Sequence, residues 1–229
     1  MAIRKEKMPK EQETKFKDLP FGQKLSYIWE YYKIHMIALV LVAGVIASAV
    51  YYYHQKNFDS VCEIIVVDGL VEDYGTRQDA ITKGFTEHLG IDGTSTRVMV
   101  NYGYSLDYII GDQEATVTQN KVYILASTGK LDGYLTEEEH IDHFSSDKEL
   151  FLFDLREILT KEELEKIGEE NFFYYTKQDG TKYPIAVNLS DTKIKKEFKL
   201  TTEKPYYGVV ITAPNKENGI EFIRWAFDL

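Results

Sequence analysis

Polar side chains able to bind a ligand follow three segments of this sequence that are typical of strands. Asp68 comes directly after the apolar run VCEIIVV, the segment NYGYS at residues 101–105 follows TRVMV, and Thr136 and Glu137 follow LDGYL. Ligands of open α/β sheets bind at the carboxyl ends of the parallel strands and at the helix N-termini that follow them. These residues therefore predict a binding edge.

The segment NYGYS is the strongest candidate at this edge. Its glycine allows close approach to the backbone, and its tyrosines offer ring faces and hydroxyl groups. The competing interpretation is an ordinary polar turn between a strand and a helix. The candidate ligand-binding residues are Asp68, Asn101, Tyr102, Tyr104, Ser105, Thr136 and Glu137.

Two histidines three residues apart suggest a metal-binding hypothesis. His140 and His143 lie in the acidic segment EEEHIDHF, and residues at i and i+3 share one face of a helix. The same pattern is typical of an exposed acidic helix, which we favour, so we expect no metal and no cofactor. The sequence has no P-loop, no H-E-x-x-H and no G-x-S-x-G motif, and we therefore expect a protein that is not an enzyme.

The elements that would position these residues alternate between strands and helices. Strands are predicted over residues 61–68, 96–102, 131–135, 183–189 and 206–212, and helices over 79–89, 114–127, 137–144, 161–168 and 215–227, while residues 150–159 read as apolar and then helical. We expect Thr136 with Glu139, and Thr160 with Glu163, to form capping boxes. The alternation predicts a three-layer α/β domain with a mostly parallel sheet.

A stretch of twenty residues without Asp, Glu, Lys or Arg precedes this domain, at residues 34–53. A helix of about 20 apolar residues spans the hydrocarbon core of a bilayer. Tyrosine and tryptophan, which favour the membrane boundary, flank it as Tyr27, Trp29, Tyr31 and Tyr32 before it and Tyr51, Tyr52 and Tyr53 after it. We predict a tail at 1–19 without fixed structure, an interfacial helix at 20–33, a transmembrane helix at 34–53 and an α/β domain at 54–229.

The distribution of charge predicts the orientation of this span in the membrane. Residues 1–33 carry eight Lys or Arg and five Asp or Glu, a net +3, and the whole chain has net −10, which leaves −13 for the remainder. The positive-inside rule then puts the N-terminus in the cytoplasm and the acidic domain outside. An acidic domain also makes nucleic acid an unsuitable partner.

Two alternatives to this arrangement stay open. Residues 47–49 (ASA) weakly resemble a signal-peptide cleavage site, although the apolar stretch is longer than usual and starts late. The single cysteine, Cys62, would carry lipid in a lipoprotein, but the polar sequence before it favours a buried strand residue.

The second half of the chain resembles extracellular solute-binding proteins with the type II periplasmic-binding-protein-like fold. The resemblance is carried by a Gln- and Thr-rich helix leading into GKLDGY at 129–134, by FDLR at 153–156, by YPIAVNLS at 183–190 and by NKENGIEFIR at 215–224. Members of that family bind a ligand between two lobes, and this domain has the length of one. The block FGQKLSYIWEYYKIH with the span also resembles a membrane anchor of Firmicute-type bacteria.

Together these patterns predict a single-pass protein of the cell membrane with a non-enzymatic, extracytoplasmic binding or sensing domain. The lipid bilayer is one partner, and a small solute or a membrane or envelope protein is the other. A substrate-binding component of a transport system and a cell-envelope enzyme without a recognisable motif are the alternatives.

Overall fold

The computed structural model describes residues 20–56, 58–71, 79–93, 95–106 and 112–229. The predicted tail at 1–19 lies outside the described residues. The chain forms two compact units, Met1–Asn57 and Phe58–Leu229.

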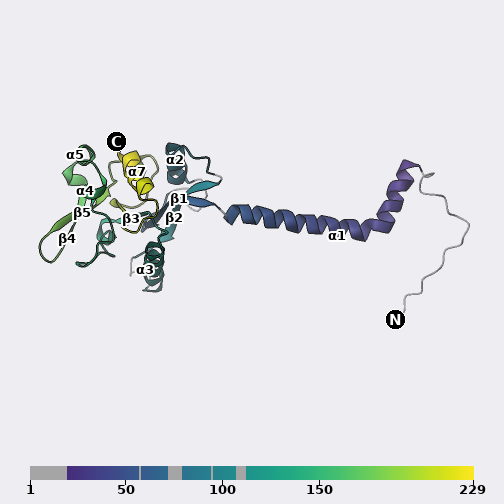
Figure 1. Cartoon of the computed structure of the whole chain (residues 1–229), viewed down its shortest axis with the longest axis horizontal. Coiled ribbons are helices and arrows are strands. Elements are labelled where there is room, and N and C mark those ends of the chain that lie inside the picture. The colour runs from purple at the N-terminus through teal and green to yellow at the C-terminus, as the bar shows by residue number, and fades with distance from the viewer. Residues whose placement is uncertain (1–19, 57, 72–78, 94, 107–111) are drawn as a thin grey trace, which may run out of the picture. The chain divides into compact units, whose positions relative to one another are not determined.

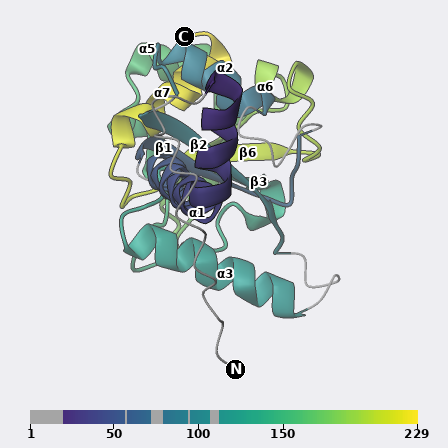
Figure 2. The same cartoon turned by 90° about the vertical axis from the view of Figure 1, so that its right-hand side faces the viewer.

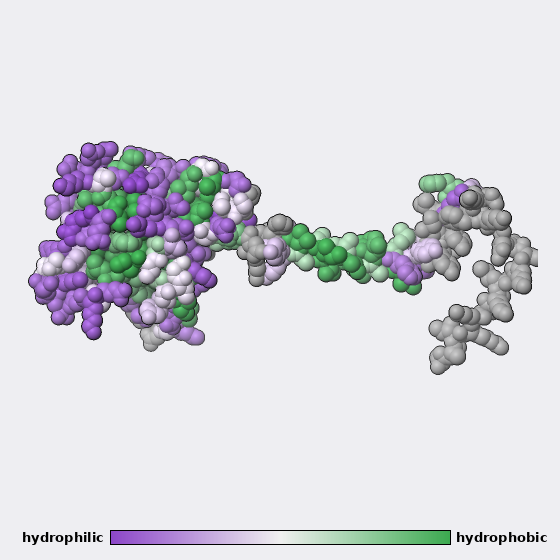
Figure 3. Space-filling model, viewed as in Figure 1, coloured by the Kyte–Doolittle hydropathy of each residue, from purple (hydrophilic) through white to green (hydrophobic). Residues whose placement is uncertain are grey.

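In the described part of the first unit, the helix α1 (Phe21–Lys56) contains both the predicted interfacial segment and the predicted apolar segment (Figure 1). Within it, Tyr32–Tyr53 is long and apolar enough to cross a membrane. A signal sequence near the N-terminus can have the same length and composition. The apolar side chains of this segment, Leu41 and Ile46 among them, are exposed and form the green band of Figure 3. Of the predicted aromatic belts, Trp29, Tyr32 and Tyr51–Tyr53 are exposed, whereas the side chains of Tyr27 and Tyr31 lie outside the described part of the chain.

The second unit alternates strands and helices at first and ends in a meander of strands and short helices. Its strands are β1 (Asp59–Val67), β2 (Thr96–Tyr104), β3 (Gly133–Glu137), β4 (Phe172–Thr176), β5 (Lys182–Asn188) and β6 (Pro205–Val209). Its helices are α2 (Ala80–His88), α3 (Asp112–Ser127), α4 (Leu155–Ile158), α5 (Lys161–Ile167), α6 (Lys193–Lys196) and α7 (Lys216–Phe227), with 3₁₀ turns η2 (Glu138–His140) and η3 (Glu169–Asn171).

The six described strands form one mixed sheet in the order β2-β1-β3-β6-β5-β4. β1 is parallel to β2 and β3, and the pairs β3–β6, β6–β5 and β5–β4 are antiparallel. The prediction of a mostly parallel sheet is therefore wrong. The physical reason is the short β4–β5 connection, in which Lys177 N donates to Thr181 O and Gly180 has φ +85, because so tight a turn joins only antiparallel strands.

The sheet separates two cores, so the domain has the predicted three layers. Successive β1 residues point to opposite faces: Cys62, Ile64 and Val66 join the core under α2 and α7, and Ile65 and Val67 join the core under α3. Figure 2 shows α3 on one side of the sheet and α2 and α7 on the other. Cys62 is buried in β1, as the strand interpretation predicts, and burial raises the pKa of its thiol.

Of the two predicted capping boxes, one is confirmed and one is wrong. Thr160 and Glu163 cap α5 reciprocally, with Glu163 Oε2 2.7 Å from Thr160 N. Thr136 instead lies inside β3, paired with Tyr206 and fully buried, and the predicted helix at 137–144 is only the 3₁₀ turn η2 followed by turns. The segment 150–159 is helical only over α4, and the strand β4 and the helix α6 were not predicted.

Candidate functional site

Asp68 lies at the carboxyl end of β1 with a left-handed backbone, φ +55. Its Oδ1 accepts hydrogen bonds from Ser105 Oγ at 2.5 Å and from Leu106 N at 3.2 Å. A non-glycine residue at positive φ carries a conformational cost, which Asp tolerates better than most residues. The carboxylate of Asp68 thus fastens the end of β2 to the end of β1.

A kink at the end of β2 delivers Ser105 to this position. Gly103 has φ +83, and the β1–β2 register shifts between Ile65 and Val67, as at a β-bulge. As a result, Tyr102 packs on the α2 side, where its hydroxyl donates to Asp79 Oδ1 at 2.8 Å, while Tyr104 packs in the core under α3. Ser105 N then donates to the buried Thr118 Oγ1 of α3.

The third strand end contributes His140, from the 3₁₀ turn that follows β3. Its Nε2 lies 3.7 Å from Asp68 Oδ2 and 3.5 Å from Glu139 Oε1. The His140 and Asp68 side chains are only 15% and 14% exposed. Asp68, Ser105 and His140, which we call the Asp68 cluster, therefore come from the ends of three neighbouring parallel strands.

His143 stands beside this cluster. Burial, and secondarily the neighbouring His140, lowers the pKa of His143, and its Nε2 is 3.3 Å from Gln119 Nε2 of α3. Because His140 is mostly buried, the segment is not the exposed acidic helix that we predicted. Within the described ranges, no three His, Cys, Asp or Glu side chains are grouped so that they could hold a metal ion.

The remaining predicted residues lie elsewhere. Asn101 Nδ2 donates to Glu63 Oε1 at 3.2 Å in the middle of the β1–β2 pair. The Glu137 carboxylate accepts from the backbone N–H groups of Glu203 and Lys204, so it holds the turn before β6. Thr136 Oγ1 is buried and has no hydrogen-bond partner in the described structure. The structure thus brings Asp68 and Ser105 together, and does not bring Asn101, Tyr102 or Glu137 to them.

The geometry of the Asp68 cluster suits binding better than nucleophilic catalysis. In a serine hydrolase, an imidazole stands between the serine and the carboxylate and takes the hydroxyl proton. Here the Ser105 hydroxyl donates directly to the carboxylate, and the imidazole of His140 faces the other carboxylate oxygen. The cluster offers a fixed acceptor and an imidazole, which can hold a hydrogen-bond donor of a ligand.

Sequence reasoning named His140 only as a metal candidate and missed it as a partner of Asp68. The signal was present, because the strand-end rule that selected Asp68 also applies to the first turn after β3. The mistaken helix start at Thr136 placed His140 a full turn inside a helix, and so away from the strand end.

Comparisons of the chain with protein-family models, with curated proteins and with solved structures find no match. The resemblance to solute-binding proteins therefore stays a prediction from the sequence.

Proposed function

We propose that this chain is a single-pass membrane protein whose C-terminal α/β domain lies outside the cytoplasm and binds a small solute at the Asp68 cluster without catalysing a reaction. The observation that carries the binding proposal is the meeting of Asp68, Ser105 and His140 at three parallel strand ends.

The membrane part of the proposal is supported by α1. Its segment Tyr32–Tyr53 has the length and apolar composition of a span, and in the described part of this unit its apolar side chains are exposed. The net charge of +3 in residues 1–33 favours a cytoplasmic N-terminus. Only residues 57 and 58 separate α1 from β1, so the domain is held close to any membrane partner.

The binding part is supported by the conformation of Asp68. A glycine would adopt φ +55 more easily, and Gly69 follows immediately, yet an aspartate occupies the position. Strain of this kind, held in place by surrounding contacts, is a feature of functional sites. A carboxylate and an imidazole favour a solute that carries hydrogen-bond donors, such as an amine or a polyol.

Cysteine labelling tests the membrane topology, because the native Cys62 is buried and is not expected to react with a maleimide in the folded protein. We would introduce Lys148→Cys at an exposed position of the domain, or Ala2→Cys in the tail, and treat intact cells with a membrane-impermeant maleimide. Labelling of residue 148 alone is expected. Labelling of residue 2 alone would show the opposite orientation. Release of the domain into the medium would identify α1 as a cleaved signal sequence.

Thermal unfolding tests the binding site. A panel of amines, amino acids and polyols would be added to the purified full-length protein in detergent, since a ligand that binds only the folded state raises the melting temperature. We expect at least one solute to stabilise the wild type and to have no effect on Asp68→Asn. If every solute that stabilises the wild type kept its full effect in both Asp68→Asn and Ser105→Ala, the Asp68 cluster would be removed from the proposal.

A further inference from the structure

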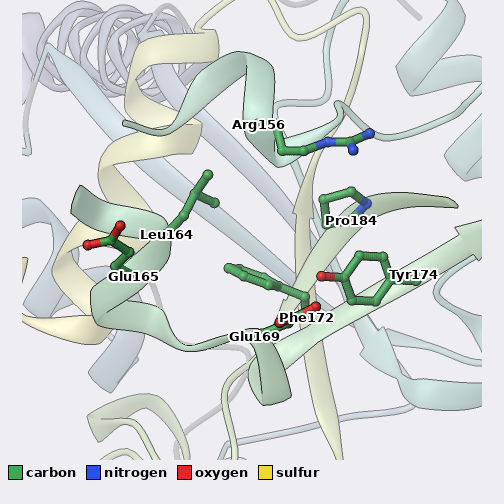
Figure 4. Close-up of a pocket in the computed structure, with 7 residues that line it drawn as sticks. All are labelled: Arg156, Leu164, Glu165, Glu169, Phe172, Tyr174 and Pro184. Atoms are coloured by element: carbon green, nitrogen blue, oxygen red, sulfur yellow. The ribbon is translucent and has the colours of Figure 1, made fainter. Parts of the chain in front are cut away.

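A second place in the domain has the form of a binding site, and it shares no residue with the Asp68 cluster. An open hollow of about 420 Å³ lies beside β4, the last strand in the sheet order (Figure 4). Its apolar lining comes from Leu164 of α5, Phe172 of β4 and Pro184 of β5. A volume of this size is within the range of small-ligand sites.

Packing explains why the hollow is open. Phe172 and Leu164 pack against the edge of the core on the α7 side of the sheet. Tyr174, two residues after Phe172 in β4, is paired with Pro184 of β5. The rings of Phe172 and Tyr174 are perpendicular, with centroids 6.4 Å apart. The four-residue helix α4 and the seven-residue helix α5 cover only part of this hairpin face, so apolar and aromatic surface stays accessible.

The charge around this surface is negative. Arg156 contributes to the lining, but its guanidinium is matched by Asp154, with Nε 2.9 Å from Oδ1 and 3.0 Å from Oδ2, and Nη2 donates further to Lys182 O. Glu165 and Glu169 also line the hollow, and neither forms an ion pair with a described lysine or arginine. The Glu169 carboxylate accepts a hydrogen bond from the Tyr174 hydroxyl, which leaves its negative charge in place. Two carboxylates are therefore left without a matching cation.

We propose that this hollow binds an organic cation, namely an ammonium or guanidinium group on a short aliphatic chain. The carboxylates of Glu165 and Glu169 match the charge, and Leu164, Phe172 and Pro184 cover the aliphatic part. The faces of Phe172 and Tyr174 attract cations through their ring quadrupoles. An anion would meet a guanidinium that Asp154 already occupies.

The cation has two possible sources with the same chemistry. A free diamine fits the hollow as a small molecule. A lysine or arginine side chain fits it as part of an extended peptide, because β4 is an edge strand whose outer backbone groups have no strand partner among the described residues. The experiment therefore has an arm for each source.

The test uses full-length protein in detergent with Trp29→Phe, so that the remaining Trp225, buried in the core of the domain, reports unfolding. The probes are cadaverine and glutarate, a diamine and a dicarboxylate of equal carbon-chain length, and a short extended peptide with one central lysine. Cadaverine, the peptide or both should raise the melting temperature, and glutarate should not.

Charge-neutral variants connect the effect to the hollow. Glu165→Gln with Glu169→Gln should weaken the apparent affinity by about tenfold or more, because charge-assisted contacts are lost. The matched control, Glu162→Gln, removes one charge from an exposed position of the same helix, outside the hollow, and should leave the affinity unchanged.

A response to cadaverine alone assigns a small-molecule site, and a response to the peptide alone assigns a site for a basic chain segment. Equal stabilisation by glutarate, persistence in the double variant, or no response to either cation overturns the proposal. Asp68→Asn should respond like the wild type, so failure here and failure of the proposed solute site are distinguishable.

Discussion

The left-handed conformation of Asp68 makes a prediction that separates backbone strain from hydrogen bonding. We would compare Asp68→Asn, Asp68→Gly and Asp68→Ala. Each substitution changes the hydrogen bonds from Ser105 Oγ and Leu106 N, and each has a different tolerance for φ +55.

The magnitudes follow from these contacts. Asparagine keeps an acceptor and tolerates positive φ, so replacing a charge-assisted bond by a neutral one should cost about 1 kcal/mol. Glycine loses both bonds, about 2 kcal/mol, while its easier backbone roughly offsets the greater entropy of its unfolded chain. Alanine loses the same bonds and adds about 1 kcal/mol of left-handed strain, for a total of about 3 kcal/mol.

The assay is urea unfolding followed by tryptophan fluorescence in the Trp29→Phe background. Trp225 is 6% exposed, and its ring centroid lies 5.4 Å from those of Phe85 and Phe198, so its emission follows the folding of this domain. The expected order of destabilisation is Asn, then Gly, then Ala. If alanine were tolerated as well as glycine, the backbone of Asp68 would not be strained, and the conformational support for a functional Asp68 would be lost.

Three further predictions concern the rest of the domain. Asp132→Ala should destabilise it by about 2–5 kcal/mol, since the buried carboxylate accepts from two backbone N–H groups that would lose their acceptor. Gly133→Ala should cost about 2–3 kcal/mol in urea unfolding, because its Cβ would overlap the buried ring of Tyr207. Burial alone would raise the pKa of Glu163, but hydrogen bonds from Arg224 and Thr160 bring it below the ordinary value. The stabilisation from Glu163 is therefore present above a pH of about 4.3, its ordinary pKa, and is lost as pH falls through the lower folded-state pKa, so Arg224→Met should reduce this acid dependence.

Controls for these predictions come from exposed positions. Asp191→Ala removes a carboxylate whose ion pair with Lys196 is solvent-exposed and should change the free energy of unfolding by less than about 1 kcal/mol. A loss as large as that of Asp132→Ala would show that removal of any carboxylate destabilises this acidic domain. An unchanged acid dependence in Arg224→Met would contradict the assignment of the Glu163 shift.

The sequence predicted those elements whose local signals agree with their tertiary surroundings. The capping box of Thr160 and Glu163 forms because α5 begins at an exposed position, where a threonine side chain is free to cap. Thr136 has the same local pattern, but tertiary pairing with Tyr206 extends β3 through it. The alternation of apolar residues in β1 predicts that its side chains enter two cores. The helical spacing of apolar residues predicts α2, α3 and α7.

The edge of the sheet could not be predicted in the same way. The β4 segment FFYYT has aromatic side chains on both faces, and its four aromatic residues are all partly exposed, so it has no clear alternation of apolar and polar residues. Its place in the sheet is set by the hairpin with β5 and not by its own pattern. The hollow beside β4 depends on that hairpin and on two short helices, and for this reason no sequence pattern indicated it.

Burial separates the candidate site at Asp68 from the other aspartate that joins segments of this domain, Asp132. The Asp132 carboxylate accepts from Glu63 N, Asn215 N and Asn215 Nδ2, is fully buried, and joins β1 to the start of α7. The Asp68 carboxylate accepts from Ser105 Oγ and, at both of its oxygens, from Leu106 N, while its side chain stays 14% exposed beside an imidazole. Both carboxylates accept hydrogen bonds from the fold, but of the two only Asp68 is reachable by a solute, and for this reason the proposed site is placed there and not at Asp132.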